Sequence, residues 1–268
     1  MKKIAIHSVP RSGSSWVGQL FNSSPKVSFR FQPLFSYAFK GGLDENSSKN
    51  DIEIFFDEIS KSNDDFLLQK DKVESGIYPG FDKDHIITHV AYKEVRYHHI
   101  LENLLQQDSE LKVIGIIRSP FSVINSFLQS PREFRRDLGW SELEEWRLAS
   151  KKNLDKKEEF YGYEKWKEVT LLFFKLKEKY PNNFYLLSYD DLLQDTKAKI
   201  IEAFNFCDLD VNQQTIEFLD ASKNVNKKDT YSVYKRKSSD RGWIETLNHK
   251  ISSEIKLDLQ ESGLVDFF

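Results

Sequence analysis

The chain of 268 residues contains a single cysteine, Cys207. One thiol cannot form a disulfide within the chain, and zinc sites built on several cysteines are excluded as well. No apolar run approaches the length of about 18 residues that spans a bilayer. The apolar stretch that follows Met1 is too short for a secretory signal. These absences predict a cytoplasmic protein that works in a reducing compartment and has no transmembrane segment.

A strong charge of either sign is also missing, because 39 basic and 42 acidic residues give a net charge of −3. A broad nucleic-acid-binding face needs a basic excess, so no nucleic-acid partner is expected. Any anion site must instead be a local cluster of basic groups. The length suits one α/β domain with a large core, and no internal repeat or long linker divides it. We therefore predict a single domain over residues 1–268.

Short apolar runs alternate with helical patterns along the chain. Such alternation predicts an α/β three-layer fold, with a central parallel sheet of about five strands and helices on both faces. The apolar runs predict strands over residues 4–8, 27–31, 86–90, 111–117 and 184–188. Helices are expected over residues 52–60, 95–107 and from 119, and near 190–205, 212–221 and 249–260.

Two segments do not follow this alternation. Residues 41–83 are polar and irregular, which is typical of a surface insertion. Residues 131–168 are dense in charged and aromatic residues. That composition fits either a solvated pair of helices with aromatic core anchors or a helical lid over a binding site, and the sequence leaves both open.

The segment between the first strand and the first helix is rich in small polar residues. Gly13 permits a tight turn, and Ser12, Ser14 and Ser15 add hydroxyl donors. Free N–H groups and the dipole at a helix start favour an anion there, and the guanidinium of Arg11 can grip an oxyanion through two bonds. A Walker A loop would need a second Gly followed by Lys, which this segment lacks. The alternative is an ordinary capped helix after a strand.

Residues 10–16, Pro-Arg-Ser-Gly-Ser-Ser-Trp, resemble the 5′-phosphosulfate loop of sulfotransferases that use 3′-phosphoadenosine 5′-phosphosulfate (PAPS). The continuation through residues 17–25 and 31–35 is most similar to the carbohydrate sulfotransferase branch. The resemblance implies a P-loop-like fold. It also implies PAPS as donor co-substrate, PAP as product, no metal, and Arg11, Ser12, Gly13, Ser14 and Ser15 as the residues that bind the 5′ end.

Two further motifs imply contacts with the 3′-phosphate of the donor. Residues 116–126 resemble the family's 3′-phosphate motif, with Arg118 at the end of a buried strand and Ser126 seven residues after Ser119 on the same helix face. Residues 236–243 resemble in part the family's C-terminal Arg-Lys-Gly loop, which implies Arg236 and Lys237 as contacts. A surface salt bridge at Arg118 and a basic turn at residues 236–237 are the alternatives.

The resemblance also implies two aromatic contacts with the adenine. Trp16 ends the 5′-phosphosulfate loop and would stack on the base, although it could equally belong to the core. Tyr189 begins a Tyr-Asp-Asp-Leu segment that is similar to one the family places near the adenine. A strand-end aromatic residue before a helix cap is the alternative for Tyr189.

For catalysis, the resemblance implies that Arg11 bridges the sulfate and the 5′-phosphate, and that Lys93 lies beside the sulfate. The family often supplies a glutamate after the second strand, but Gln32 stands there and cannot usefully accept a proton. We therefore expect the base at Glu94, or else at His98 or His99, whose ordinary pKa suits proton transfer.

The sequence thus predicts an enzyme that moves a sulfuryl group from PAPS to an acceptor hydroxyl, with a carbohydrate as the favoured acceptor. Positioning and electrostatics should carry most of the rate, as in phosphoryl transfer. The acceptor cleft is expected to use Phe35, Tyr37, Phe39 and the tryptophans of residues 140–166. The alternatives are a non-catalytic protein that binds PAP or another nucleotide, and a kinase with a variant phosphate loop.

Overall fold

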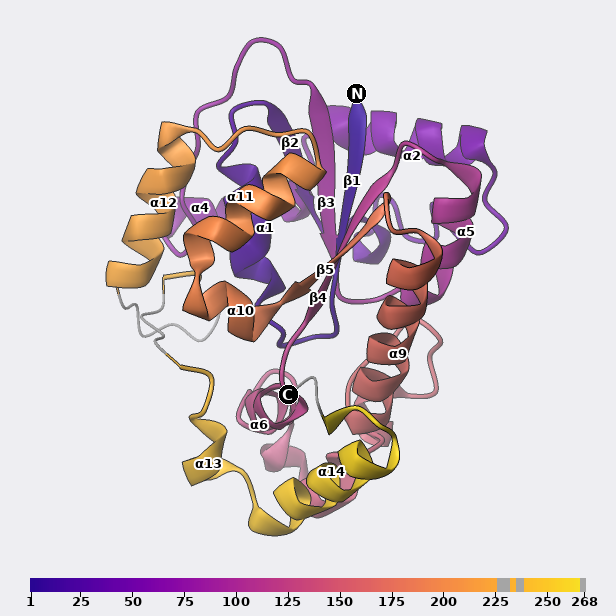
Figure 1. Cartoon of the computed structure of the whole chain (residues 1–268), viewed down its shortest axis with the longest axis vertical. Coiled ribbons are helices and arrows are strands. Elements are labelled where there is room, and N and C mark those ends of the chain that lie inside the picture. Colours follow the sequence, from indigo (N-terminus) through magenta and orange to yellow (C-terminus); the bar gives the residue numbers. More distant parts are fainter. Residues whose placement is uncertain (226–231, 235–238, 266–268) are drawn as a thin grey trace.

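The computed structural model describes residues 1–225, 232–234 and 239–265 (Figure 1). Its centre is a five-stranded sheet in the order β2-β3-β1-β4-β5, and every neighbouring pair is parallel. The predicted α/β fold with a central parallel sheet is therefore confirmed. The strands are β1 (Lys2–His7), β2 (Val27–Phe31), β3 (His89–Glu94), β4 (Lys112–Ile117) and β5 (Phe184–Ser188).

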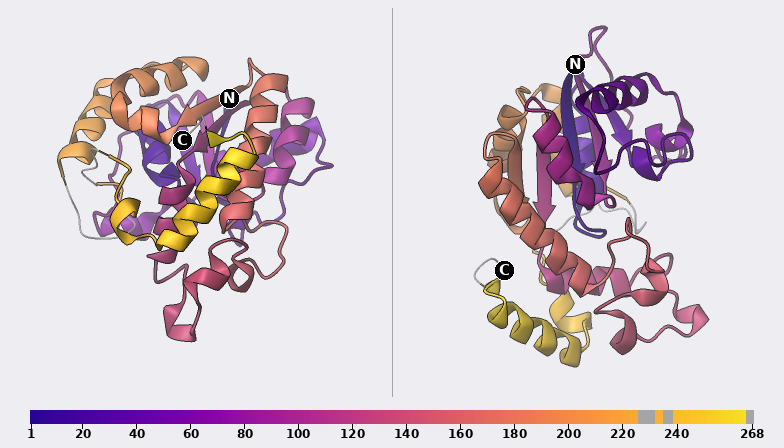
Figure 2. Two further views of the ribbon diagram at one scale, coloured as in Figure 1. Left: turned by 60° about the horizontal axis from the view of Figure 1, so that its bottom comes forward. Right: turned by 90° about the vertical axis from the view of Figure 1, so that its right-hand side faces the viewer.

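Apolar side chains of the strands are buried on both faces of the sheet. On β1, Ile4 and Ile6 point to one face and Ala5 to the other, and all three are fully buried. Successive side chains of a strand alternate between faces, so a strand covered on both sides becomes a continuous apolar run. Figure 2 shows helices on either side of the sheet. This double burial is why the strands could be recognised in the sequence.

One face of the sheet is covered by helices that contribute to the core around Ile4, Ile6 and Ile114. In α1, the buried residues Val17, Leu20 and Phe21 follow the spacing of one helical face. The helices of this side are α1 (Ser14–Asn22), α10 (Tyr189–Gln194), α11 (Thr196–Phe206) and α12 (Gln213–Asn224).

The opposite face carries a second core around Ala5, Tyr92 and Val113. Helix α6 begins with Pro120 in its first turn, as the sequence predicts. The helices that contribute to this core are α2 (Lys49–Lys61), α5 (Leu101–Gln107), α6 (Pro120–Leu128), α9 (Tyr163–Lys179) and α14 (His249–Glu261). Trp146, directly after α7 (Glu142–Glu145), also belongs to it, and Trp243 of α13 (Trp243–Thr246) packs against it. Among the described residues, no helix is long and apolar enough to cross a membrane.

The third strand lies later in the chain than its predicted range of 86–90. β3 spans His89–Glu94 and pairs in register with the whole of β1, from Lys2 opposite His89 to His7 opposite Glu94. The prediction was wrong because Lys93 and Glu94 are charged yet buried, so they interrupt the apolar pattern that marks a strand. The predicted helix over 95–107 is also shorter, since the helical turn η2 (His98–Ile100) precedes α5.

The two irregular segments contain more structure than the sequence predicts. The helix expected at 52–60 is α2, which Ser48 and Asp51 begin with a capping box. Two short helices follow, α3 (Asp65–Leu68) and α4 (Lys70–Glu74). The second segment contains η3 (Arg136–Leu138), α7, α8 (Ser150–Asn153) and the start of α9. The turn η1 (Pro33–Phe35) follows β2 directly.

We expect Gly115→Ala to destabilise the fold. A Cβ atom at this position of β4 would lie 2.4 Å from the ring of Phe184 and 2.9 Å from that of Phe173. Overpacking of this kind typically costs about 1–3 kcal/mol of unfolding free energy, which urea denaturation would measure. Gly80→Ala is the matched control, because the nearest atom to its Cβ would be 3.7 Å away. Equal stability of the two variants would contradict this packing.

Candidate functional site

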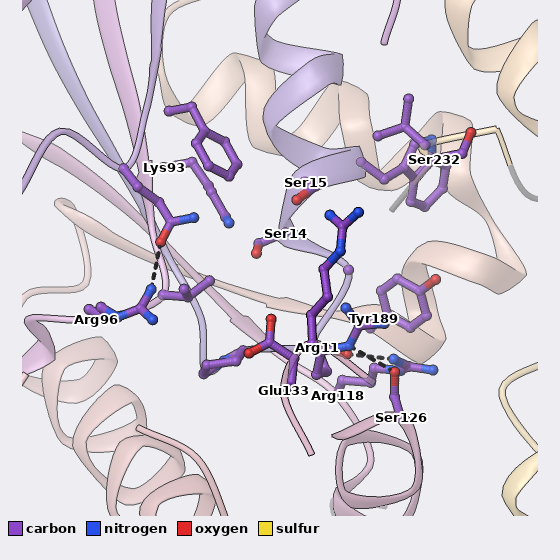
Figure 3. Close-up of a pocket in the computed structure, with 18 of the residues that line it drawn as sticks. Arg11, Ser14, Ser15, Lys93, Arg96, Arg118, Ser126, Glu133, Tyr189 and Ser232 are labelled. Carbon is purple, nitrogen blue, oxygen red and sulfur yellow. Dashed lines mark hydrogen bonds between the residues drawn. The ribbon is translucent and has the colours of Figure 1, made fainter. Parts of the chain in front are cut away.

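A cavity of about 510 Å³ lies at the carboxyl ends of the strands (Figure 3). Ligands of open α/β sheets bind in this position, because the loops that follow the strands converge there. A single acidic side chain, Glu133, lines the cavity within the described part of the chain. Eight basic side chains line it as well, namely Arg11, Lys72, Lys93, Arg96, Arg118, Arg132, Lys152 and Lys223. The cavity is therefore suited to anions.

The loop that follows β1 forms one wall of this cavity. Gly13 has a left-handed φ of +83° and begins α1, where its carbonyl accepts from the backbone N–H of Trp16 at 3.0 Å. A Cβ on Gly13 would lie 2.3 Å from the ring of Tyr189, so only glycine fits here. Ser14 and Ser15 line the cavity, whereas Ser12 is fully buried beneath it.

The predicted pair Arg118 and Ser126 lies in the cavity, linked through Arg11. The Arg11 Nε donates to the Ser126 hydroxyl at 3.0 Å. The Arg118 guanidinium donates to the backbone carbonyl of Arg11 at 2.5 Å. Figure 3 shows the three side chains converging below Ser14 and Ser15. Residues from the ends of β1 and β4 and from α6 thus form one hydrogen-bonded group.

Asp240 also binds Arg118, and the sequence did not single it out. Its carboxylate accepts from the Arg118 Nε at 2.7 Å and from a terminal nitrogen of the same guanidinium. Trp243 stacks on Phe121 of α6 at 4.4 Å and anchors this part of the chain. The similarity of residues 236–243 to a family loop could have indicated Asp240. Only the basic residues of that loop were considered in the prediction. Arg236 and Lys237 lie outside the described residues.

Trp16 and Tyr189 form the aromatic end of the cavity. Their ring centroids are 6.4 Å apart and the rings are nearly perpendicular. The Trp16 indole N–H donates to the Ser222 hydroxyl at 2.9 Å, and the Arg118 guanidinium lies over the Tyr189 ring at 4.9 Å. The structure brings both predicted aromatic residues to the cavity, in addition to their contacts with the core.

The neighbouring residues Lys93 and Glu94 point to opposite faces of the sheet. Lys93 lines the cavity, and its Nζ lies 4.6 Å from the centre of the Phe31 ring. Burial lowers the pKa of Lys93 to about 7. Glu94 is fully buried away from the cavity, where its carboxylate accepts from the backbone N–H of Leu34 at 2.9 Å. Burial raises the pKa of Glu94 to about 8.

The two predicted histidines are also outside the cavity. His98 is fully buried, and its Nδ1 lies 3.1 Å from the Nδ1 of His7. Burial lowers the pKa of both rings, that of His7 to about 3. His99 is partly exposed, and its ring lies 3.7 Å from the Glu45 carboxylate. The structure therefore brings Lys93 to the cavity but none of the three predicted bases.

Gln32 lines the cavity, and its side chain is held by Arg96. The Gln32 Oε1 accepts from the Arg96 guanidinium at 3.0 Å, as the dashed line in Figure 3 shows. The Arg96 Nε in turn donates to Glu159 at 3.0 Å, and its guanidinium lies over the Phe35 ring at 4.0 Å. Gln32 is thus positioned at the cavity wall, but its amide carries no charge and cannot act as a base.

The two irregular segments supply further walls of the cavity. The sequence left a lid over a binding site open for residues 131–168 but predicted no contact from residues 41–83. Phe66, Lys72 and Tyr78 come from the first segment. From the second come Arg132, Glu133, Lys152 and Tyr161. Of the aromatic residues expected in the acceptor cleft, only Phe35 lies there. Tyr37 is fully exposed, and the others pack in or against the core, namely Phe39, Trp140, Trp146 and Trp166.

Residues 1–262 match the family model described as the sulfotransferase domain. The chain belongs to the sulfotransferase family. The predicted PAPS-dependent sulfuryl transfer is therefore confirmed at the level of the family. A search of curated proteins finds no match.

Solved structures of sulfotransferases share the fold. A mouse sulfotransferase SULT7A1 complexed with PAP is 14% identical, with a TM-score of 0.58 over 97% of this chain and 83% of that one. A retinol dehydratase in complex with androsterone and PAP is 12% identical, with a TM-score of 0.56 over 97% and 80%. The sulfotransferase domain of the Synechococcus PCC 7002 olefin synthase is 15% identical, with a TM-score of 0.51 over 97% and 93%.

The buried Glu94 makes the stability of this sulfotransferase depend on pH. Its pKa is about 8 in the folded chain against an ordinary 4.5, so the folded state holds a proton that the unfolded state has lost. The unfolding free energy should therefore fall as pH rises from 4.5 to 8, by up to about 1.4 kcal/mol per pH unit. Glu94→Gln should remove this fall in urea denaturation at a series of pH values.

The matched control is Glu110→Gln, which changes an exposed carboxylate. It should leave the pH dependence of stability as in the unaltered chain. A Glu94→Gln variant with the same pH dependence as the unaltered chain would contradict the raised pKa.

Proposed function

We propose that the cavity binds PAPS along the wall formed by Arg11, Arg118 and Tyr189, and that the enzyme transfers the sulfuryl group to a carbohydrate hydroxyl. The convergence of three predicted nucleotide-binding motifs on one cavity carries the first half of this proposal. The composition of the opposite wall supports the second half. The two halves are tested by separate experiments.

The 5′ end of the donor belongs at the loop between β1 and α1. Backbone N–H groups at the start of α1 and the hydroxyls of Ser14 and Ser15 can donate to phosphate and sulfate oxygens. Arg11 and Lys93 supply positive charge on two sides of the same space (Figure 3). As the bond to sulfur breaks, negative charge grows on the oxygen that leaves with PAP. Cations fixed beside that oxygen stabilise the transition state more than the ground state.

The 3′-phosphate belongs near Arg118 and Ser126. Arg118 is buried, and a buried guanidinium binds phosphate more strongly than an exposed one because water competes less. The adenine then lies between Trp16 and Tyr189, whose rings form the adjoining end of the cavity. PAPS thus extends from Lys93 to the aromatic end, with its two charged ends on separate clusters of cations.

The opposite wall suits a carbohydrate acceptor. Phe31, Phe35, Phe66 and Tyr78 offer flat apolar surfaces for the C–H faces of sugar rings. Lys72 lies over the rings of Phe31 and Tyr78, at 4.9 Å from each, and Arg96 lies over Phe35. Their N–H groups can bond sugar hydroxyls. A purely apolar acceptor would displace water from these cations and offer them no polar group, which is costly.

Removal of the Arg118 side chain tests the site of the 3′-phosphate. Each hydrogen bond to a charged group contributes about 1.5–3 kcal/mol, so Arg118→Ala should weaken PAP binding by about 10- to 100-fold in calorimetry. Binding of adenosine 5′-monophosphate, which lacks the 3′-phosphate, should change much less. Arg136→Ala, on the exposed turn η3, is the control. An equal loss for both nucleotides would place the 3′-phosphate elsewhere.

The acceptor class is tested with radiolabelled PAPS against neutral and acidic oligosaccharides, phenols and sterols. We expect sulfated product with an oligosaccharide. Phe35→Ala should raise the KM for that acceptor by about 10-fold and leave the KM for PAPS unchanged, because an aromatic face contributes about 1 kcal/mol or more beyond its buried area. Turnover confined to phenols or sterols would overturn the carbohydrate proposal while leaving the donor site intact.

A further inference from the structure

We propose that Glu133 is the general base that takes the proton from the acceptor hydroxyl. The inference rests on the proposed placement of the 5′ end of PAPS at Arg11. It does not depend on the acceptor being a carbohydrate, since any hydroxyl acceptor must lose its proton during the transfer.

Glu133 is the one carboxylate that lines the cavity in the described part of the chain. Other buried carboxylates near the site are engaged elsewhere. Glu94 lies on the opposite face of the sheet and binds the backbone of Leu34. Glu159 pairs with Arg96, and Asp240 pairs with Arg118. Gln32, where the family often has a glutamate, cannot take a proton. A base inside the cavity must therefore come from another element, and Glu133 is in place.

The backbone and one oxygen of Glu133 are held firmly. Glu133 follows α6, and its backbone N–H donates to the carbonyl of Ser130 at 2.9 Å. The Tyr161 hydroxyl donates to the Glu133 Oε2 at 2.6 Å, and the Lys152 Nζ lies 2.7 Å from the same oxygen. Both of these contacts fall on Oε2, so neither of them occupies Oε1, the oxygen proposed to receive the proton. Figure 3 shows Glu133 beside Arg11 among the residues that line the cavity.

The surrounding charges keep Glu133 ionised. Burial alone would raise the pKa of Glu133, but Lys152, the Tyr161 hydroxyl and the charge of Arg11 outweigh it and hold the pKa below the ordinary value. Burial and the neighbouring carboxylate of Glu133 raise the pKa of Tyr161 well above its usual range, so its hydroxyl remains a donor. The effect of Arg11 on Glu133 also indicates that the carboxylate lies within electrostatic reach of the group assigned to the sulfate.

The step balances without a further reactant. The acceptor oxygen forms a bond to sulfur with its lone pair, and the bond between sulfur and the bridging oxygen of PAPS breaks. That bridging oxygen leaves with the electron pair as part of PAP. The proton of the acceptor hydroxyl passes to the Glu133 Oε1 as the new bond forms, and solvent then takes it from the carboxyl group. Lys152 and Tyr161 act as positioning residues, since they orient the carboxylate without touching the reacting atoms.

The first test is Glu133→Gln, which keeps the shape of the side chain and removes its ability to accept a proton. General base catalysis contributes about 10²- to 10⁴-fold, so kcat should fall by that factor while calorimetry finds PAP binding unchanged. The control is Glu144→Gln, an exposed carboxylate of the same segment, which should keep the activity of the unaltered enzyme. Turnover is measured with the acceptor that the panel identifies. If no compound is sulfated, it is measured as hydrolysis of PAPS, in which water is the acceptor.

The second test separates a base from a structural ion pair. Lys152→Met removes the cation that lowers the pKa of Glu133, so the acidic fall in kcat/KM should move to higher pH. Activity well above that pH should be largely kept. A purely structural role for the pair would instead lower activity equally at every pH. This test stands even if Glu133→Gln fails to fold.

Near-normal turnover by Glu133→Gln would overturn the proposal, as would an unmoved acidic limb in Lys152→Met. If Glu94→Gln rather than Glu133→Gln abolished transfer, the assignment of the base to Glu133 would be wrong. The failure of the carbohydrate proposal is seen separately, as sulfation of a different acceptor class by the unaltered enzyme. Failure of the donor placement is seen separately as well. In that case Arg118→Ala would weaken the binding of PAP no more than that of adenosine 5′-monophosphate.

Discussion

The close contact between Gly13 and the ring of Tyr189 determines how the site is assembled. Gly13 belongs to the loop after β1, and Tyr189 directly follows β5 at the edge of the sheet. Because no side chain separates them, the loop that carries Arg11 is held against the aromatic end of the cavity. Arg118, from the end of β4, lies over the same tyrosine ring and donates to the Arg11 backbone. Three strand ends are thereby joined through one point of contact.

Much of the fold, and the cavity wall proposed to bind the nucleotide, could be predicted from the sequence, because both depend on local patterns. Buried strands are continuous apolar runs, and the loop at residues 10–16 lies next to the helix that it begins. The walls at Lys72, Tyr78 and Tyr161 could not be predicted in this way. These residues come from segments without strong periodicity, and only the folded chain brings them together with a loop more than 50 residues away.

The prediction of Glu94 as base shows where the sequence argument was incomplete. Once β3 extends to Glu94, the alternation of a strand places Lys93 and Glu94 on opposite faces. The helix expected to begin at Val95 hid that alternation. Lys93 and Glu94, the buried charged residues that made β3 hard to recognise, are also the residues whose orientation decides which of them lines the cavity. The position of a titratable residue within an element therefore matters as much as its type.

The pairing of Arg118 with Asp240 has a consequence for the end of the reaction cycle. Two of the guanidinium's five N–H groups donate to the carboxylate and a third donates to the Arg11 carbonyl, which leaves two for a ligand. A cation whose charge is already partly balanced attracts a phosphate less strongly than an isolated one. At the 3′-phosphate site proposed for Arg118, the spent nucleotide would therefore dissociate more easily than from an unbalanced arginine, because the protein itself provides part of the balancing negative charge.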